Sequence, residues 1–160
     1  MMSSRHELLP HKAEDFRKQE YWDKFFNQRG EKAFEWYGEY ASLRPGLQAL
    51  LGLPDDAPVS LLRRLKAKVR VLVVGCGNSA LSGDLVADGF GNLLSVDFSR
   101  RVIDEMQRKH PTMQWRVMDM TDMRTLEDAS FELVMDKGAL DALMADDTNE
   151  IKEDASEDVK

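Results

Sequence analysis

The sequence predicts an α/β fold built on a parallel sheet, and two observations support this fold class. From residue 69 onward, short apolar runs alternate with segments of helical character, and this order is typical of parallel strands joined by crossover helices. The run over 69–74 is almost continuously apolar and β-branched, which is typical of a strand covered on both faces. Further strands are expected at 93–97, 113–118 and 131–136, and helices at 80–88, 99–109 and 138–144.

Composition divides the chain of 160 residues into distinct regions. A polar N-terminus is expected to be flexible, an aromatic-rich helical lead-in follows it, and the α/β core comes next. The last region holds seven acidic residues and two lysines, with too few apolar side chains to bury a face, so we expect it to be disordered. In chain order these regions are 1–12, 13–68, 69–145 and 146–160.

The lead-in carries most of the aromatic side chains of the chain. The pattern over 13–28 predicts one amphipathic helix, which Gly30 would end as a C-terminal cap. Pro45 is expected to interrupt or restart the next helix, because proline suits the first turn of a helix and not its interior. The basic run at 63–70 is expected to be a solvated helix face.

Composition and charge exclude several classes of protein. No apolar run is long enough to cross a membrane, and the N-terminus lacks the apolar core of a signal peptide. A single cysteine, Cys76, cannot form an internal disulfide, so we expect a cytoplasmic protein. The net charge of −7 comes mostly from the acidic tail, and the remainder of the chain offers no basic surface for nucleic acid. His6, His11 and His110 do not have metal-ligand spacing, so no metal site is expected.

A glycine-containing turn follows the first predicted strand. Gly75 and Gly77 belong to the run Gly-Cys-Gly-Asn-Ser-Ala, which fits the G-x-G-x-x-A pattern between a strand and a helix. Glycine is needed where a ligand approaches the backbone so closely that a Cβ would collide with it. The N-terminus of the following helix offers free N–H groups to an anion. The pattern alone leaves a second interpretation open, in which the glycines form a tight turn with no ligand.

Asp97 strengthens the ligand interpretation. It lies about 20 residues after Gly77, at the predicted end of the second strand, where an acid can accept hydrogen bonds from ribose hydroxyls. Ligands of open α/β sheets bind at the carboxyl ends of the strands, so both features belong to one cleft. They predict an adenosine-containing ligand and leave its identity open. The alternative for Asp97 is an exposed acid or a helix cap before Ser99.

Polar residues also follow the third and fourth predicted strands. Asp119 is expected to accept from an adenine amine, while the Met120 N–H donates to the ring. Lys137 is expected to reach the polar end of the ligand or to help define where a second substrate, the acceptor of a transferred group, enters the cleft. The alternatives are that Asp119 caps the following turn and that Lys137 is solvated.

Several segments resemble one known family of enzymes. They are YWDKFF at 21–26, FEWYG at 34–38, GCGNSALS at 75–82 and DKGALDA at 136–142. Together they are similar to the methyltransferases that modify lysine, and in a larger enzyme also the N-terminus, of elongation factor 1-alpha. The resemblance implies a Rossmann-like class I methyltransferase sheet with S-adenosyl-L-methionine as cofactor and S-adenosyl-L-homocysteine as product. It also implies a protein substrate, elongation factor 1-alpha, methylated on lysine.

Position by position, the resemblance implies cofactor contacts from the lead-in and the core: Trp22, Phe26, Trp36, Gly75, Asp97, Asp119, Met120 and Lys137. The glycine pattern adds Gly77 to these expected contacts. Phe26 stands where a relative has tyrosine, so a hydroxyl contact is lost there while the ring surface stays. Aromatic rings over the cleft would exclude water and attract the positively charged sulfonium. The alternative for these rings is core packing of the helical lead-in. The motifs identify no catalytic base.

The C-terminal end departs from the family pattern. After Met144 no further strand is predicted, so the sheet is expected to be truncated after the fourth strand. That strand would then be an edge able to pair with another chain. Three alternatives to protein-lysine methylation stay open, and the missing strands favour the first of them. They are a non-catalytic cofactor-binding or interaction module, a nicotinamide-dependent enzyme, and an aminopropyltransferase of the spermidine-synthase type.

Overall fold

The structure is a computed structural model, and it describes residues 10, 12–30 and 32–145 of the chain. The predicted acidic tail at 146–160 and most of the predicted flexible N-terminus at 1–12 lie outside the described residues. Within the described residues, none of the helices has both the length and the apolar surface that crossing a lipid bilayer requires.

A parallel sheet forms the centre of the fold, as the sequence predicts. Its strands are β1 (Arg70–Val74), β2 (Asn92–Asp97), β3 (Gln114–Val117) and β4 (Leu133–Asp136). They lie in the order β3-β2-β1-β4, and every pairing is parallel. Val71 of β1 pairs with Leu93 on one side and with Leu133 on the other. Because all the strands run in one direction, their carboxyl ends meet at the same edge of the sheet.

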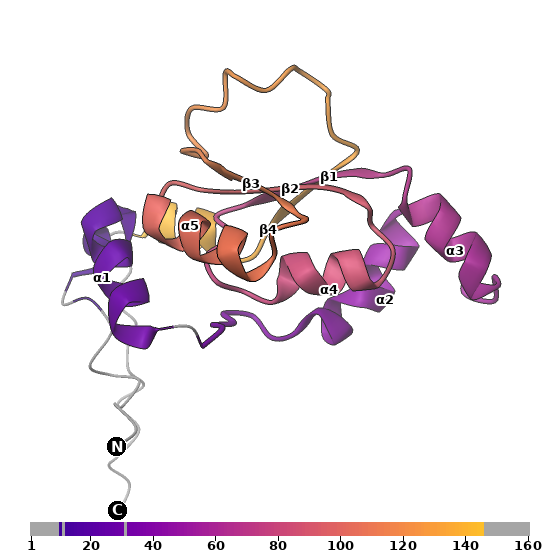
Figure 1. Cartoon of the computed structure of the whole chain (residues 1–160), viewed down its shortest axis with the longest axis horizontal. Coiled ribbons are helices and arrows are strands. Elements are labelled where there is room, and N and C mark those ends of the chain that lie inside the picture. Colours follow the sequence, from indigo (N-terminus) through magenta and orange to yellow (C-terminus); the bar gives the residue numbers. More distant parts are fainter. Residues whose placement is uncertain (1–9, 11, 31, 146–160) are drawn as a thin grey trace, which may run out of the picture.

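Helices follow the strands at the positions that the sequence predicts. α4 (Leu81–Ala87) follows β1, α5 (Arg100–Lys109) follows β2, and α6 (Ala139–Met144) follows β4. Ser99 caps α5, because its hydroxyl accepts a hydrogen bond from the backbone N–H of Val102. Figure 1 shows α4 and α5 on one side of the sheet and the connection between β3 and β4 on the other.

Side chains alternate between the two faces of the sheet and build a core on each face. Val71 and Val73 of β1 belong to a core that also contains side chains of α4 and α5. Leu72 and Val74 belong to a second core, which the connection between β3 and β4 helps to cover with apolar side chains: Met118, Met120, Met123, Leu126 and Phe131. Both faces of β1 are therefore buried, which explains its continuous apolar sequence.

The lead-in begins with two short helices, a 3-10 helix η2 (Ala13–Arg17) and α1 (Gln19–Arg29). The prediction of one continuous helix over 13–28 is wrong, because Lys18 adopts an extended conformation between them. The Trp22 indole donates to the carbonyl of Phe16 at 2.6 Å and holds η2 against α1. Gly30 ends α1 at a φ of 64°, as predicted.

Two further helices complete the lead-in, α2 (Tyr40–Leu50) and α3 (Val59–Lys66). Pro45 lies inside α2, so the prediction that it interrupts or restarts this helix is wrong. A proline there removes the hydrogen bond to the carbonyl of Ala41, but both residues are exposed and water can hydrate that carbonyl. Tyr40 and Leu47 are buried and hold the helix on the core.

A buried ion pair joins α2, α3 and α4. Lys66 is 1% exposed and its Nζ lies 2.5 Å from Asp88 Oδ2, so the prediction of a solvated basic face is wrong for this residue. The Tyr40 hydroxyl donates to the same carboxylate at 2.6 Å, and Arg44 Nε lies 3.2 Å from its other oxygen. Because Asp88 directly follows α4, its carboxylate ties three helices together.

Candidate functional site

A cavity of about 360 Å³ lies at the carboxyl ends of the strands. The ends of β1 and β2, the glycine turn, α6 and the aromatic lead-in all line it. Every residue that the sequence predicts for the site is among these lining residues: Trp22, Phe26, Trp36, Gly75, Gly77, Asp97, Asp119, Met120 and Lys137. The fold thus brings residues that lie far apart in the sequence to the lining of one cavity.

The glycine turn is held closely by the protein itself. Gly75 and Gly77 have φ values of 55° and 49°, in the left-handed region that favours glycine. A Cβ on Gly75 would lie 2.1 Å from the Cβ of Ala139, and one on Gly77 would lie 3.2 Å from the ring of Phe26. Glycine is therefore required here by the approach of α6 and of the lead-in, which the glycine pattern alone does not predict.

Asp97 lies beside the glycine turn, as the sequence predicts. Its side chain is buried, and Oδ2 accepts a hydrogen bond from the N–H of Gly77 at 2.9 Å. Oδ1 accepts from the N–H of Ser99 at 2.9 Å. Burial raises the pKa of Asp97 to about 6, and the nearby carboxylate of Asp23 adds to this, whereas the N–H groups of Ser99, Gly77 and Phe98 lower it. The alternative of an exposed acid is thus wrong, and this carboxylate fastens the start of α5 to the turn.

The raised pKa of Asp97 gives the ligand-free protein a pH-dependent stability. The folded protein binds this proton more tightly than the unfolded chain, so Asp97 lowers the free energy of unfolding as the pH rises from about 4 to about 6. The loss is at most about 3 kcal/mol and is complete above about pH 6. Urea unfolding of the wild type and of Asp97→Asn at several pH values measures it as the difference between the two proteins. A difference that stays the same at about pH 4 and about pH 7 would contradict the prediction.

Asp119 lies at the cavity and also caps the turn that follows β3. Its Oδ1 accepts from the backbone N–H of Thr121 at 2.8 Å and from the Thr121 hydroxyl at 2.7 Å. Asp119 remains exposed and Met120 is half-buried beside it, with both residues lining the cavity. The alternative that Asp119 caps the following turn is therefore confirmed. The two hydrogen bonds to Thr121 use Oδ1, so they leave Oδ2 available for another donor.

The aromatic rings of the lead-in serve both the core and the cavity. Trp22 and Phe26 are buried in the same core as β1, and each also lines the cavity. Trp36 is 41% exposed, and its ring meets that of Trp22 at a centroid distance of 6.4 Å and an angle of 77°. Trp22 and Phe26 thus contribute both to the core and to the lining of the cavity, whereas Trp36 lines the cavity and is partly exposed to solvent.

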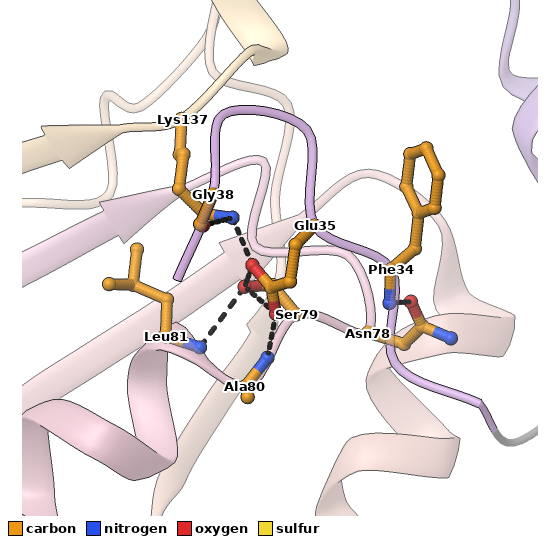
Figure 2. Close-up of polar contacts among 8 residues, drawn as sticks. All are labelled: Phe34, Glu35, Gly38, Asn78, Ser79, Ala80, Leu81 and Lys137. Carbon is orange, nitrogen blue, oxygen red and sulfur yellow. Dashed lines mark hydrogen bonds and ion pairs between the residues drawn. The ribbon is translucent and has the colours of Figure 1, made fainter. Parts of the chain in front are cut away.

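Glu35 occupies the N-terminus of α4. The sequence predicts free N–H groups there for an anion, but the N–H of Ala80 donates to Glu35 Oε1 at 2.7 Å (Figure 2). The Ser79 hydroxyl donates to the same carboxylate at 2.9 Å, and its oxygen accepts from the N–H of Leu81 at 3.0 Å. The expectation of a free anion site is therefore wrong, because a side chain of the lead-in supplies the anion.

Lys137 forms an ion pair with the same carboxylate. Its Nζ contacts Glu35 Oε2 and lies 3.5 Å from the carbonyl of Gly38, as Figure 2 shows. The Lys137 side chain is 10% exposed, so the alternative of a solvated lysine is wrong. Lys137 nevertheless lines the cavity, with its ammonium group held at the wall by the lead-in.

Sequence reasoning missed several residues of this site. Glu35 lies inside the FEWYG segment, but nothing in the sequence pairs it with the glycine turn or with Lys137. Asn78 lies in the glycine turn, and its buried amide binds the lead-in by accepting from the N–H of Phe34 at 3.2 Å. One signal in the sequence could have found these residues. The segments that carry the family resemblance are expected to meet at one site, so polar residues within them are candidates for contacts with one another.

Comparisons with known proteins show which families the chain is similar to. The methyltransferase domain family matches residues 71–157 of the chain. The Bos taurus protein named eEF1A lysine and N-terminal methyltransferase is 42% identical over 144 residues, which are 88% of this chain and 18% of that protein. The Mus musculus protein named EEF1A lysine methyltransferase 4 is 37% identical over 141 residues, which are 86% of this chain and 49% of that protein. The chain therefore spans less than a fifth of the first of these relatives and about half of the second.

An X-ray structure of the sugar N-methyltransferase KedS8 from Streptoalloteichus aligns with 66% of this chain and 44% of that one. The identity is 22% and the TM-score is 0.36. The match to the methyltransferase domain covers more than half of the chain and runs from Val71 in β1 to beyond β4. The chain therefore belongs to the methyltransferase domain family.

Proposed function

We propose that this chain binds S-adenosyl-L-methionine in the cavity and transfers its methyl group to a lysine of a protein. Elongation factor 1-alpha is the candidate acceptor, because the relatives named above carry that substrate in their names. The observation that carries the proposal is the position of Asp97 beside the glycine turn at the carboxyl ends of β1 and β2. Family membership and the aromatic lining of the cavity support it further.

The donors and acceptors around the cavity fit an adenosine-containing ligand. The Asp97 carboxylate accepts from the N–H groups of Gly77 and Ser99, and the N–H of Phe98 also interacts with it. A carboxylate has about four acceptor positions, so at least one stays available for a ribose hydroxyl. Asp119 and the Met120 N–H would bind the adenine edge. Lys137 would lie beside the polar amino-acid end of the ligand, with its charge balanced by Glu35.

The aromatic residues would supply the apolar and cation-binding part of the site. Trp22, Phe26 and Trp36 present ring surfaces to the cavity, and such surfaces attract a sulfonium cation and exclude water. Phe26 offers ring surface without a hydroxyl. We further propose that residues 13–68 act as the cover of the site and residues 69–145 as its cofactor-binding base.

The chemistry of transfer assigns the protein a positioning role. The cofactor supplies an activated methyl group on a positively charged leaving group, so the reaction needs no covalent bond to the protein. The cavity walls would align the acceptor nitrogen and hold water out, which contributes through proximity and orientation. A dry cavity also favours the neutral form of the acceptor amine, the form that can attack the methyl group.

The binding half of the proposal is tested with S-adenosyl-L-homocysteine and isothermal calorimetry. Asp97→Ala is expected to weaken binding by about 1–3 kcal/mol, the range for a lost hydrogen bond to a charged group. Asp104→Ala serves as the control, because Asp104 is an exposed acid on α5 outside the cavity lining. Equal affinity of Asp97→Ala and wild type would remove Asp97 from the site.

The transfer half is tested with a radiolabelled methyl donor and purified elongation factor 1-alpha. Label on a lysine of that protein supports methyl transfer. Binding of S-adenosyl-L-homocysteine without label on any protein favours a non-catalytic cofactor-binding module, and transfer of an aminopropyl group favours the spermidine-synthase type. Thermal stabilisation by NAD without stabilisation by S-adenosyl-L-homocysteine favours a nicotinamide-dependent enzyme.

Two further predictions stand apart from this proposal. β4 lies at the edge of the sheet in the described part of the chain, but nothing in that part or in the comparisons favours its pairing with a second chain. The cytoplasmic location stays a prediction, which fluorescence microscopy of the tagged protein tests.

A further inference from the structure

Glu35 lies between two residues that line the cavity, but its own side chain points elsewhere. Phe34 and Trp36 line the cavity, whereas Glu35 lines a second hollow together with Ala80 and residues of α2 and α4. Figure 2 shows its carboxylate between the glycine turn and Lys137. Glu35 therefore contacts residues of the cavity wall on the side away from the cavity, and it does not line the cavity itself.

One carboxylate joins three parts of the chain that the sequence keeps apart. Glu35 comes from the lead-in, Ser79 and Ala80 from the turn after β1, and Lys137 from the residues after β4. Each partner donates to the carboxylate, and two of the donors are the start of a helix and an ammonium group, which both favour a negative charge. A neutral or shorter side chain does not satisfy all of these donors.

Asn78 provides a second attachment beside Glu35. Its Oδ1 accepts from the N–H of Phe34, and its Nδ2 donates to the carbonyl of Lys32 at 3.1 Å. Asn78 is 3% exposed, so these bonds are shielded from water. The segment that carries Phe34 and Trp36 is thus fixed at two neighbouring points, one through its backbone and one through the Glu35 carboxylate.

The pair formed by Glu35 and Lys137 is largely removed from water. The side chains are 22% and 10% exposed. Removal of one partner would leave the other charge poorly hydrated, and such a group moves toward solvent or toward another charge. The position of the Lys137 ammonium at the cavity wall therefore depends on Glu35.

We propose that Glu35 is a positioning residue of the cofactor site, which holds the aromatic lead-in over the cavity and keeps Lys137 at the cavity wall. The proposal rests on the proposed function above, since it concerns the same cavity. Glu35 acts through Phe34, Trp36 and Lys137, and it does not touch the cofactor. Its removal should loosen the cover and displace the lysine together.

The experiment compares Glu35→Gln with wild type in binding of S-adenosyl-L-homocysteine by calorimetry. Glutamine keeps the size and one acceptor for the Ala80 N–H but loses the charge that pairs with Lys137. Affinity is expected to fall at least about tenfold, as for a lost charge-assisted hydrogen bond. Glu39→Gln is the matched control, because Glu39 is exposed, lies four residues further along the same segment and makes no capping hydrogen bond to α2.

Two readouts without ligand separate positioning from general stability. Hydrogen exchange at the Phe34 amide reports the attachment of the segment, and the NMR signal of the Trp36 indole reports the cover. Glu35→Gln should speed the exchange at Phe34 and shift the indole signal by more than its loss of global stability accounts for. Lys137→Met breaks the same ion pair from the other side, so it should shift the indole signal similarly. Combining both substitutions should weaken binding by less than the sum of the single effects.

The outcomes distinguish the two proposals. Glu35→Gln that binds like wild type, with unchanged Phe34 exchange, overturns the role of Glu35. If Glu35→Gln unfolds, Lys137→Met decides the matter, and an unshifted Trp36 signal in that variant overturns the role. A wild type that binds no S-adenosyl-L-homocysteine overturns the proposed function, while the ligand-free exchange and indole signals still test the hold of Glu35 on the lead-in.

Discussion

Gly75→Ala is expected to lower the free energy of unfolding by about 2–5 kcal/mol and to abolish measurable binding of S-adenosyl-L-homocysteine. The new Cβ would lie 2.1 Å from the Cβ of Ala139, and the residue would have to keep a φ of 55°. The left-handed conformation alone costs an alanine about 1–2 kcal/mol, and the collision adds the cost of moving α6 away from the strand ends. Urea unfolding measures the first effect and calorimetry the second.

Gly91→Ala is the matched control for this substitution. A Cβ on Gly91 meets no heavy atom within 4 Å, and its φ lies outside the left-handed region. The control should therefore unfold and bind nearly as wild type does. Gly77→Ala should fall between the two, because its new Cβ would lie 3.2 Å from the ring edge of Phe26. Equal stability of the Gly75 and Gly91 variants would show that α6 does not approach the turn as described.

Asp88→Ala is expected to destabilise the protein by about 3–5 kcal/mol, because it leaves the Lys66 ammonium buried without its anion. The Lys66 side chain is 1% exposed, and its Nζ lies 2.5 Å from the lost carboxylate. The Tyr40 hydroxyl also loses its acceptor. Chemical unfolding of the wild type and the variant at neutral pH measures the difference.

The acid side of the stability profile offers an independent check on Asp88. Burial raises the pKa of Asp88, but hydrogen bonds from Lys66 and Tyr40 outweigh that effect and leave the pKa lowered. The stabilisation is thus fully present above the pKa of the unfolded chain and is lost as the pH falls through the folded value. The difference between wild type and Asp88→Ala should therefore shrink in acid.

Two further variants serve as controls for the buried pair. Asp88→Ala combined with Lys66→Met should recover part of the loss, since no unpaired charge remains buried. Asp122→Ala removes an ion pair with Arg124 on the surface, where the side chains are 51% and 88% exposed, and it should change little. A loss for Asp88→Ala no larger than that of Asp122→Ala would contradict the buried network.

The sheet and its cleft were predictable from the sequence because their signals are local. Strands buried on both faces need continuous apolar runs, and the run at 69–74 has one. Parallel strands bring their carboxyl ends to one edge, so Asp97 had to lie near the turn after β1. The predicted strand boundaries differ from the observed ones by no more than two residues; the fourth strand, for example, was predicted over 131–136 and is observed over Leu133–Asp136.

The errors concern contacts between distant residues. Lys66 stands in a basic run that resembles a solvated face, and only Asp88 and the packing of α2 and α4 explain its burial. Glu35 reaches Ser79 and Lys137 across 44 and 102 residues, and no spacing rule connects them. The prediction for Pro45 is wrong because the exposure of Ala41, which lets water replace the missing hydrogen bond to its carbonyl, is a tertiary property.

The strand order has a consequence for folding during synthesis. β1 obtains its second neighbour only when β4 has been made, since Val71–Val74 pair with Leu133–Asp136. A ribosome-bound chain ending before β4 therefore exposes one unpaired edge of β1, the most apolar strand, to other nascent chains. Pairing across so many residues also makes the closing step slow relative to formation of the helices. We expect chaperone dependence to be greatest while the segment between β3 and β4 is being translated.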